Sequence, residues 1–369
     1  MLQDKANLGL GIQTFVRIWI SFLLIFSLVV DASAIELPNL ATQLPHILVL
    51  DNCDSGNVPP FNDVVLLLNN KGEVVNRIKG LSICQSIGDN RAISVSEDGR
   101  FFVICEHDVV NKITAYDLPT GIEVWSLAGS FRSAAIAQGV TYALTSGDTI
   151  YGSGITAIDS TGNIIKQSEE ASGFDIVVDP NANCLWLVGG DIKKCDMNLN
   201  VVKTIDPITW CAVSVDICSD GSIWVAEREH PDEAGSQNRL LNISSKGKIL
   251  QNVPLKDLSP MCVRVNKSNG SVWVTGGLCP IRKRLTFRQW PPWRRRPSGY
   301  IGPRTQKYSS KGKLLLEIKR GGHSIDIDPS DGSVWIADRT QLLHYSSEGK
   351  KLETCDEVSD DSKCITIVK

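Results

Sequence analysis

The sequence lacks the short motifs of the commonest nucleotide-binding, hydrolytic and haem-binding proteins. It contains no Walker loop, no dinucleotide fingerprint, no G-x-S-x-G elbow and no CxxCH, which removes those functions from the first candidates. It also lacks a strong charge imbalance, because 38 basic and 41 acidic residues leave a net charge of −3. With 42% hydrophobic and 21% charged residues, the composition is that of an ordinary globular protein and excludes wholesale disorder, collagen and multi-span membrane architecture.

The N-terminus has the pattern of a secretory signal peptide. Lys5 and Arg17 precede an uncharged run, Ile18 to Val30, and small residues up to Ala34 suit signal peptidase. The run has 13 residues, fewer than the roughly 20 that span a bilayer, so an uncleaved anchor is the weaker alternative. We therefore predict removal of residues 1–34 and a secreted or periplasmic protein without a transmembrane span.

The eleven cysteines form no CxxC pair, so the sequence does not predict a structural zinc site. All follow the predicted signal peptide, where export would permit disulfides. Two bridges are predicted: Cys184 with Cys195, which flank a Gly-Gly turn, and Cys355 with Cys364, which bracket a polar loop. The alternative is that most are buried thiols that act as small hydrophobic residues.

An internal repeat is the strongest pattern in the sequence. Four segments combine an alternating apolar strand, a polar turn and a second strand with an aromatic residue: 94–105, 214–226, 263–275 and 324–337. Their Asp-Gly or Asn-Gly turns favour tight type I′ hairpins, in which both central residues have positive φ. Aromatic residues anchor six units, namely Phe102, Tyr142, Trp186, Trp224, Trp273 and Trp335.

A second turn follows each aromatic residue, so each unit of about 40 residues predicts four strands, a to d, the size of a propeller blade. A seventh such turn near Gly72 indicates a first blade without an innermost strand, which residues 364–368 are expected to supply by pairing with Ile47 to Leu50. The prediction is an all-β propeller of seven four-stranded blades within residues 35–369, with six or eight blades as alternatives. The predicted blades are 46–80 with 364–368, 89–127, 131–169, 173–205, 211–253, 261–318 and 323–355.

The repeats resemble those of the NHL family and related β-propellers. The resemblance is carried by residues 323–328 leading into 332–349, with another copy at 238–243, and it covers about residues 89–355. Members of this family bind proteins, RNA or small ligands, or catalyse lyase and lactonase reactions. The resemblance therefore implies a fold and not one function.

The loops between strands b and c vary most, and the longest is a 26-residue insertion from Cys279 to Arg304. Variable loops on a rigid scaffold usually carry binding, and tryptophan and arginine are typical of interface hot spots. The alternative is a solvated loop that pairs with the acidic loop of the preceding blade. The candidate binding residues are Arg282, Lys283, Arg284, Arg288, Trp290, Trp293, Arg294, Arg295 and Arg296.

Chemistry at the channel mouth of a propeller needs convergent side chains. The candidates there are Glu106, Glu227, His323 and Asp338, and the oxygens of the three carboxylates suit a hard cation such as calcium. Neither the Glu/Asn/Asp set of propeller lactonases nor the His and Glu set of propeller lyases is matched by spacing. A segment at 326–332 has some likeness to a calcium loop but lacks the closing glutamate. No cofactor is expected, and calcium or another divalent ion is the alternative.

The sequence thus predicts an exported, non-catalytic propeller that binds a protein or an anionic ligand through the face formed by its b–c and d–a loops. The alternatives are a metal-dependent lyase or lactonase, and a subunit of a larger extracytoplasmic complex instead of a monomer. Export makes nucleic acid an unexpected partner. Sequons at Asn242, Asn266 and Asn269 matter only if the source glycosylates exported proteins.

Overall fold

The computed structural model describes residues 46–51, 63–81, 91–106, 111–145, 154–206, 211–229, 237–277, 302–338, 341–355, 358 and 362–368. The chain divides into two compact units, Met1–Leu44 and Pro45–Lys369, and every described residue belongs to the second. The predicted signal peptide and the candidate binding residues 282–296 lie outside the described residues. Within the described ranges, no helix is long and apolar enough to cross a membrane.

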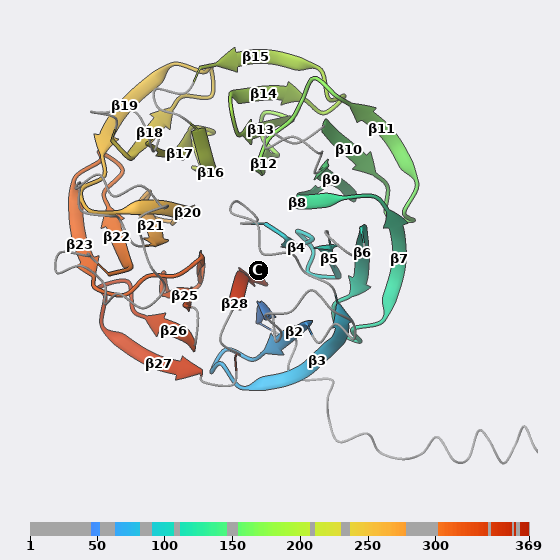
Figure 1. The fold of residues 1–369 in the computed structure, drawn as a ribbon, viewed down its shortest axis with the longest axis horizontal. Helices are drawn as coiled ribbons and strands as arrows, with labels where there is room; N and C mark the ends of the chain where they lie inside the picture. The colour runs from blue at the N-terminus through green and yellow to red at the C-terminus, as the bar shows by residue number, and fades with distance from the viewer. Residues whose placement is uncertain are drawn as a thin grey trace, which may run out of the picture. The chain divides into compact units, whose positions relative to one another are not determined.

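Seven four-stranded antiparallel sheets, the blades, are arranged around a central axis (Figure 1). This confirms the predicted seven-bladed propeller. From the axis outward, blade 1 consists of β28 (Ser362–Ile367), β1 (Ile47–Asp51), β2 (Asp63–Leu68) and β3 (Val74–Leu81). The other blades, in the same radial order, are blade 2 with β4 (Ile93–Val95), β5 (Phe101–Glu106), β6 (Lys112–Asp117) and β7 (Glu123–Ala128); blade 3 with β8 (Phe131–Ala137), β9 (Val140–Thr145), β10 (Gly154–Ile158) and β11 (Ile164–Ser168); blade 4 with β12 (Asp175–Asp179), β13 (Cys184–Val188), β14 (Ile192–Asp196) and β15 (Val201–Ile205); blade 5 with β16 (Cys211–Ile217), β17 (Ile223–Arg228), β18 (Arg239–Ile243) and β19 (Ile249–Pro254); blade 6 with β20 (Ser259–Val265), β21 (Val272–Gly277), β22 (Arg304–Tyr308) and β23 (Leu314–Ile318); and blade 7 with β24 (Ser324–Ile327), β25 (Val334–Asp338), β26 (Gln341–Tyr345) and β27 (Lys351–Cys355).

The C-terminal strand closes the ring, as the sequence predicts. β28 pairs antiparallel with β1, with Ile367 opposite Ile47 and Cys364 opposite Leu50. The backbone N–H of Val368 also donates to the carbonyl of His46 at 2.8 Å. β28 thereby covers the edge of β1 that would otherwise be unpaired and gives blade 1 its fourth strand.

The core consists of seven apolar clusters, one at each junction between neighbouring blades. The inner strands are buried on both faces, which explains their continuous apolar and β-branched sequences. The four tryptophans of the repeat are at most 1% exposed, and each packs toward the following blade: Trp186, Trp224, Trp273 and Trp335.

Phe102 is not the structural counterpart of these tryptophans. In blade 5 the a–b hairpin closes at Ser222, directly after a glycine, and Trp224 follows two residues later. In blade 2, Arg100 lies between the turn glycine, Gly99, and the residue that closes the hairpin, Phe101. Because of this extra residue, Val103 occupies the position that a tryptophan has in the other blades. Phe102 faces blade 1 instead.

The predicted type I′ turns are also wrong. In the Asp-Gly and Asn-Gly hairpins, positive φ occurs at Gly99, Gly221, Gly270 and Gly332 and not at the residue before each glycine. The loops contain three or four residues, the length at which a type I turn is followed by one left-handed residue.

Candidate functional site

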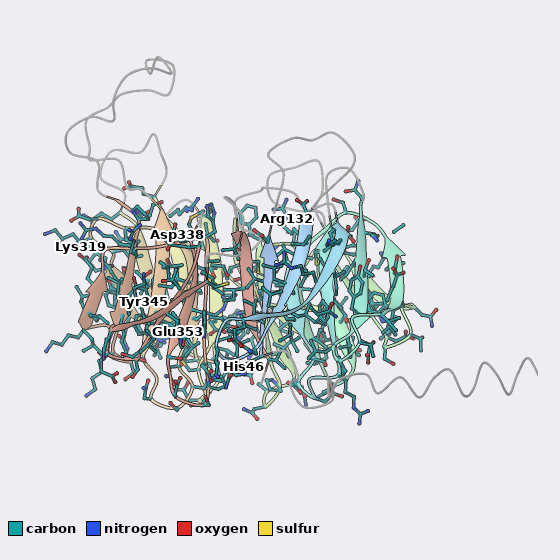
Figure 2. The ribbon with its side chains drawn as sticks, turned by 90° about the horizontal axis from the view of Figure 1, so that it is seen from below. His46, Arg132, Lys319, Asp338, Tyr345 and Glu353 are labelled. Carbon is teal, nitrogen blue, oxygen red and sulfur yellow. The ribbon has the colours of Figure 1, made fainter. Side chains whose placement is uncertain are left out.

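The ring has two faces of different construction. Figure 2 shows Arg132, Lys319 and Asp338 at one face and His46 at the opposite face. The first, here called the loop face, carries the b–c and d–a connections. The second, the turn face, carries the a–b and c–d turns, all of which lie within the described ranges.

Four carboxylates occupy the same place at the end of strand b, next to the loop face. They are Asp51, Glu106, Glu227 and Asp338, which belong to blades 1, 2, 5 and 7 respectively. The comparison of blade positions in the sequence did not find Asp51. The first three are at most 2% exposed. Glu106 Oε1 lies 3.2 Å from Lys112 Nζ and accepts from Thr114 Oγ1 at 3.4 Å, and Asp338 Oδ2 lies 4.0 Å from Arg320 Nη1.

The structure does not group the predicted channel-mouth residues as a metal site. Among the described residues, which include Glu106, Glu227, His323 and Asp338, no group of three or more His, Cys, Asp or Glu could hold a metal ion. In the loop with some likeness to a calcium site, two carboxylate oxygens accept within the hairpin: Asp328 Oδ1 from Ser330 N–H at 2.9 Å, and Asp331 Oδ1 from Ser333 N–H at 2.7 Å. These oxygens therefore act as turn caps.

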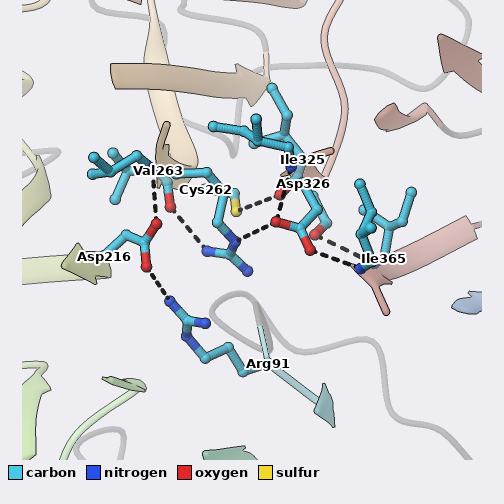
Figure 3. A network of polar contacts seen from close by, with 12 residues as sticks. Arg91, Asp216, Cys262, Val263, Ile325, Asp326 and Ile365 are labelled. Carbon is cyan, nitrogen blue, oxygen red and sulfur yellow. Dashed lines mark hydrogen bonds and ion pairs between the residues drawn. The ribbon is translucent and has the colours of Figure 1, made fainter. Parts of the chain in front are cut away.

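A network of charged side chains lies at the ring axis (Figure 3). Arg91, which precedes β4 of blade 2, donates from Nε to Asp175 Oδ1 at 3.1 Å and from Nη2 to Asp216 Oδ1 at 3.1 Å. Arg91 thereby connects blade 2 with blades 4 and 5. On blade 6, Arg264 Nε lies 3.7 Å from Asp326 Oδ1 of blade 7.

The same carboxylates accept backbone N–H groups from the inner strand of the next blade. Asp175 accepts from Val215 at 3.0 Å, Asp216 from Val265 at 2.8 Å, and Asp326 from Ile367 at 2.8 Å. Ser214 and Ser324, two residues before Asp216 and Asp326, accept in the same way from Val263 and Ile365. The signal in the sequence is the pattern Ser-x-Asp within a strand that is otherwise apolar, because alternate residues of an inner strand face one side.

The electrostatics keep this network charged. Burial would raise the pKa of Asp216, but the guanidinium groups of Arg91 and Arg264 outweigh burial and hold the pKa below its usual value. Burial likewise opposes the charge of Arg264, yet Cys262 and the three carboxylates raise its pKa. Burial raises the pKa of the Cys364 thiol, which lies on the innermost strand, to about 11. The network thus joins permanent charges and suits a structural role better than proton transfer near neutral pH.

The predicted disulfides are not present in the structure. Cys184 and Cys195 are both free thiols, and they face opposite sides of blade 4, because Cys195 lies opposite Leu185 and not Cys184. Cys355 lies on the outer strand between blades 7 and 1, whereas Cys364 lies on an innermost strand between blades 1 and 2. A disulfide needs Cβ atoms that point toward each other, and separate blade junctions do not provide them.

No protein-family model and no curated protein matches the sequence. Solved structures do match it. A functionally unknown protein from Desulfotomaculum acetoxidans has a TM-score of 0.62 at 12% identity, over 87% of this chain and 98% of that one. Hydrazine synthase from Kuenenia stuttgartiensis has a TM-score of 0.58 at 16% identity, over 73% of this chain and 80% of that one. BamB from Moraxella catarrhalis has a TM-score of 0.50 at 13% identity, over 87% of this chain and 85% of that one.

At such identities the similarity shows the fold alone. The chain is a seven-bladed β-propeller. Membership of the NHL family stays a prediction from the repeats, since no family model matches.

Proposed function

We propose that this protein is an exported, non-catalytic propeller that binds a protein or an anionic ligand through its loop face, with residues 282–296 as the main contact. The proposal rests on how the structure uses the charged residues near the axis. The axial arginines and aspartates are committed to contacts between blades, and no group of three or more His, Cys, Asp or Glu among the described residues could hold a metal ion. Chemistry that needs several convergent groups has less support than recognition by the loops of the same face.

The loop face also carries described cationic side chains where the insertion joins the fold. Arg304, the last residue of the insertion, begins β22 and pairs with Glu317, whereas Lys319 and Arg320 are exposed on the following d–a loop. The Arg320 side chain is 60% exposed. These groups would add to the attraction that the insertion exerts on an acidic partner.

A binding assay with two acidic probes tests the proposal, using polyglutamate for an acidic protein segment and a heparin oligosaccharide for an anionic polysaccharide. A variant with the seven basic residues at 282–284, 288 and 294–296 changed to glutamine, together with Trp290→Ala and Trp293→Ala, should bind one of them at least about tenfold more weakly. Equal binding by the two proteins would contradict the proposal. So would a stoichiometric divalent ion in dialysed protein, detected by plasma mass spectrometry, which would favour the metal-dependent enzyme.

A further inference from the structure

The turn face carries a ridge of lysines on blades 5 and 6. Their c–d turns share the sequence Ser-Ser-Lys-Gly-Lys, which places two lysines on each turn. All four side chains are exposed: Lys246 and Lys248 on blade 5, and Lys311 and Lys313 on blade 6. We call these four residues the lysine ridge.

Contacts with the preceding blade hold each of the two turns in place. The blade 6 turn packs against β19 of blade 5, where Gln251 Nε2 donates to the carbonyl of Ser310 at 2.9 Å. A Cβ added to Gly312 would lie 2.5 Å from Val253 Cγ2. The blade 5 turn is held in the same manner, because Lys203 Nζ of blade 4 donates to the carbonyl of Lys246 at 2.9 Å. The backbones that carry the four lysines therefore have fixed positions on the turn face of two neighbouring blades.

Exposed aliphatic side chains follow the lysines directly in the chain. Leu250 is 52% exposed, and Leu314 and Leu315 are 46% and 53% exposed. They lie at the start of β19 and β23, the outermost strands of their blades. The ridge thus combines positive charge with exposed apolar surface.

The positive charge is little compensated within the described residues. The turns of blades 5 and 6 contain one acidic residue, Asp220, whose Oδ1 accepts from Ser222 N–H at 2.9 Å. Glu317 lies at the other end of β23 and pairs with Arg304. No carboxylate of the described part of the chain forms an ion pair with any of the four lysines.

The residue types decide between two classes of partner. Hot spots of protein interfaces are rich in tryptophan, tyrosine and arginine, and lysine is depleted there, yet the ridge contains only lysine and leucine. Lysine is a compact point charge that suits a diffuse negative surface better than a bidentate contact. Basic residues beside exposed aliphatic ones are typical of proteins that rest on anionic membranes.

We propose that the lysine ridge, with Leu250, Leu314 and Leu315, docks the propeller reversibly on an anionic phospholipid surface. Lysines near such a surface each strengthen binding modestly, and the leucines insert at the level of the headgroups. The ridge lies on the turn face, so docking leaves the loop face open for its own partner. This inference is independent of the function proposed above.

Vesicle flotation of the full-length protein tests the proposal. The vesicles consist of phosphatidylcholine with either about 30% phosphatidylserine, which makes them anionic, or none. The quadruple variant K246Q/K248Q/K311Q/K313Q should lose binding to anionic vesicles by about tenfold or more. A matched control, K79Q/K166Q/K256Q/K319Q, removes four exposed lysines that lie outside the turns of the turn face and should bind like the parent protein. Higher salt should weaken binding of the parent and control alike.

The outcomes separate this proposal from the alternatives. Equal losses in both quadruple variants would assign binding to net charge and overturn it, as would equal binding of all proteins to neutral vesicles through the N-terminal apolar run. Binding of polyglutamate through the ridge without binding to vesicles would assign the surface to an acidic protein segment. A second variant, L250S/L314S/L315S, should also float less with anionic vesicles while its thermal midpoint stays close to that of the parent.

Discussion

Asp216 illustrates how one buried carboxylate connects several blades. Its two oxygens receive Arg91 from blade 2 and the Val265 N–H from blade 6, while Asp216 itself lies on blade 5. Removal of one partner from a buried pair leaves the other charge uncompensated in a poorly solvated site. At this scale, the axial network stabilises the arrangement of the blades.

Asp216→Asn should lower the free energy of unfolding by about 3 kcal/mol or more, because it removes charge from between two guanidinium groups but keeps a hydrogen-bond acceptor. Since the folded state lowers the pKa of Asp216, its contribution is present above the pKa of the unfolded chain and is lost as pH falls through the folded value. The difference between the two proteins should therefore shrink in acid. Urea unfolding at several pH values measures both effects, with the exposed Asp206→Asn as the control; a constant difference down to pH 2 contradicts the assignment.

His46 joins blade 1 to blade 7 on the turn face. Its Nε2 lies 2.6 Å from Asp328 Oδ2, and the hydrogen bond to Asp328 raises the pKa of His46 against the effect of burial. Such a contribution is complete below the unfolded pKa of about 6.5 and is lost as pH rises through the raised folded value. His46→Gln should remove this alkaline loss of stability, which thermal unfolding between pH 6 and 9 would detect; parallel pH curves for the two proteins would argue against the ion pair.

At the scale of elements, the c–d turns lock each blade against its neighbour. Each turn carries a residue with positive φ, usually glycine. In several blades this glycine also lets the turn pack closely against the outer strand of the preceding blade. At Gly162, an added Cβ would lie 2.9 Å from Cβ of Trp125, which is on β7. The register shifts within all seven c–d pairs, and such an interruption of the ladder at an edge strand hinders further pairing.

Gly162→Ala should be more destabilising than Gly139→Ala. Both residues have positive φ, +89° and +75°, but nothing lies within 4 Å of the Cβ position at Gly139. The free energy of unfolding of the Gly139 variant should fall by about 1 kcal/mol because of backbone conformation alone. That of the Gly162 variant should fall by this amount plus the cost of the steric contact with Trp125. Denaturant titration provides the comparison, and equal losses would show that the turn moves freely away from Trp125.

At the scale of the whole molecule, the ring depends on a strand from the far end of the chain. Four residues of β1, the strand that pairs with β28, are fully buried: Ile47, Leu48, Val49 and Leu50. Ser324 and Asp326 of blade 7 accept backbone N–H groups from the same strand. Blade 1 is therefore complete only when both ends of the propeller meet.

Removal of residues 362–369 should abolish cooperative unfolding, because it exposes the β1 edge and the apolar residues behind it. Size-exclusion chromatography should show association of the shortened protein, and its thermal transition should be broad or lost. The milder Ile365→Ala and Ile367→Ala, at positions 1% and 3% exposed, should lower the midpoint but keep one transition. A monomeric truncation with the parent's midpoint would show that β28 is dispensable.

Local patterns were sufficient to predict the architecture. The period of about 40 residues, the turn glycines and the apolar alternation each depend on neighbours close in the chain, so they predicted seven blades and even the closing role of residues 364–368. The position of Phe102 was predicted incorrectly because one residue after Gly99, Arg100, shifts which side chain faces which blade. A shift of one residue exchanges the two faces of a strand.

Only the tertiary structure decided which distant residues meet. Whether Cys184 and Cys195 face each other depends on the register between two strands, and Arg91 meets Asp216 125 residues away because blades 2 and 5 share the axis. The four b-strand carboxylates have equivalent places in the repeat, yet no group of three or more His, Cys, Asp or Glu among the described residues could hold a metal ion, so sequence equivalence did not imply a metal site. The sequence by itself determined the blade, because a blade is built from short-range pairing. The ring determined the contacts at its axis and between its turns, because these depend on closure of all seven blades.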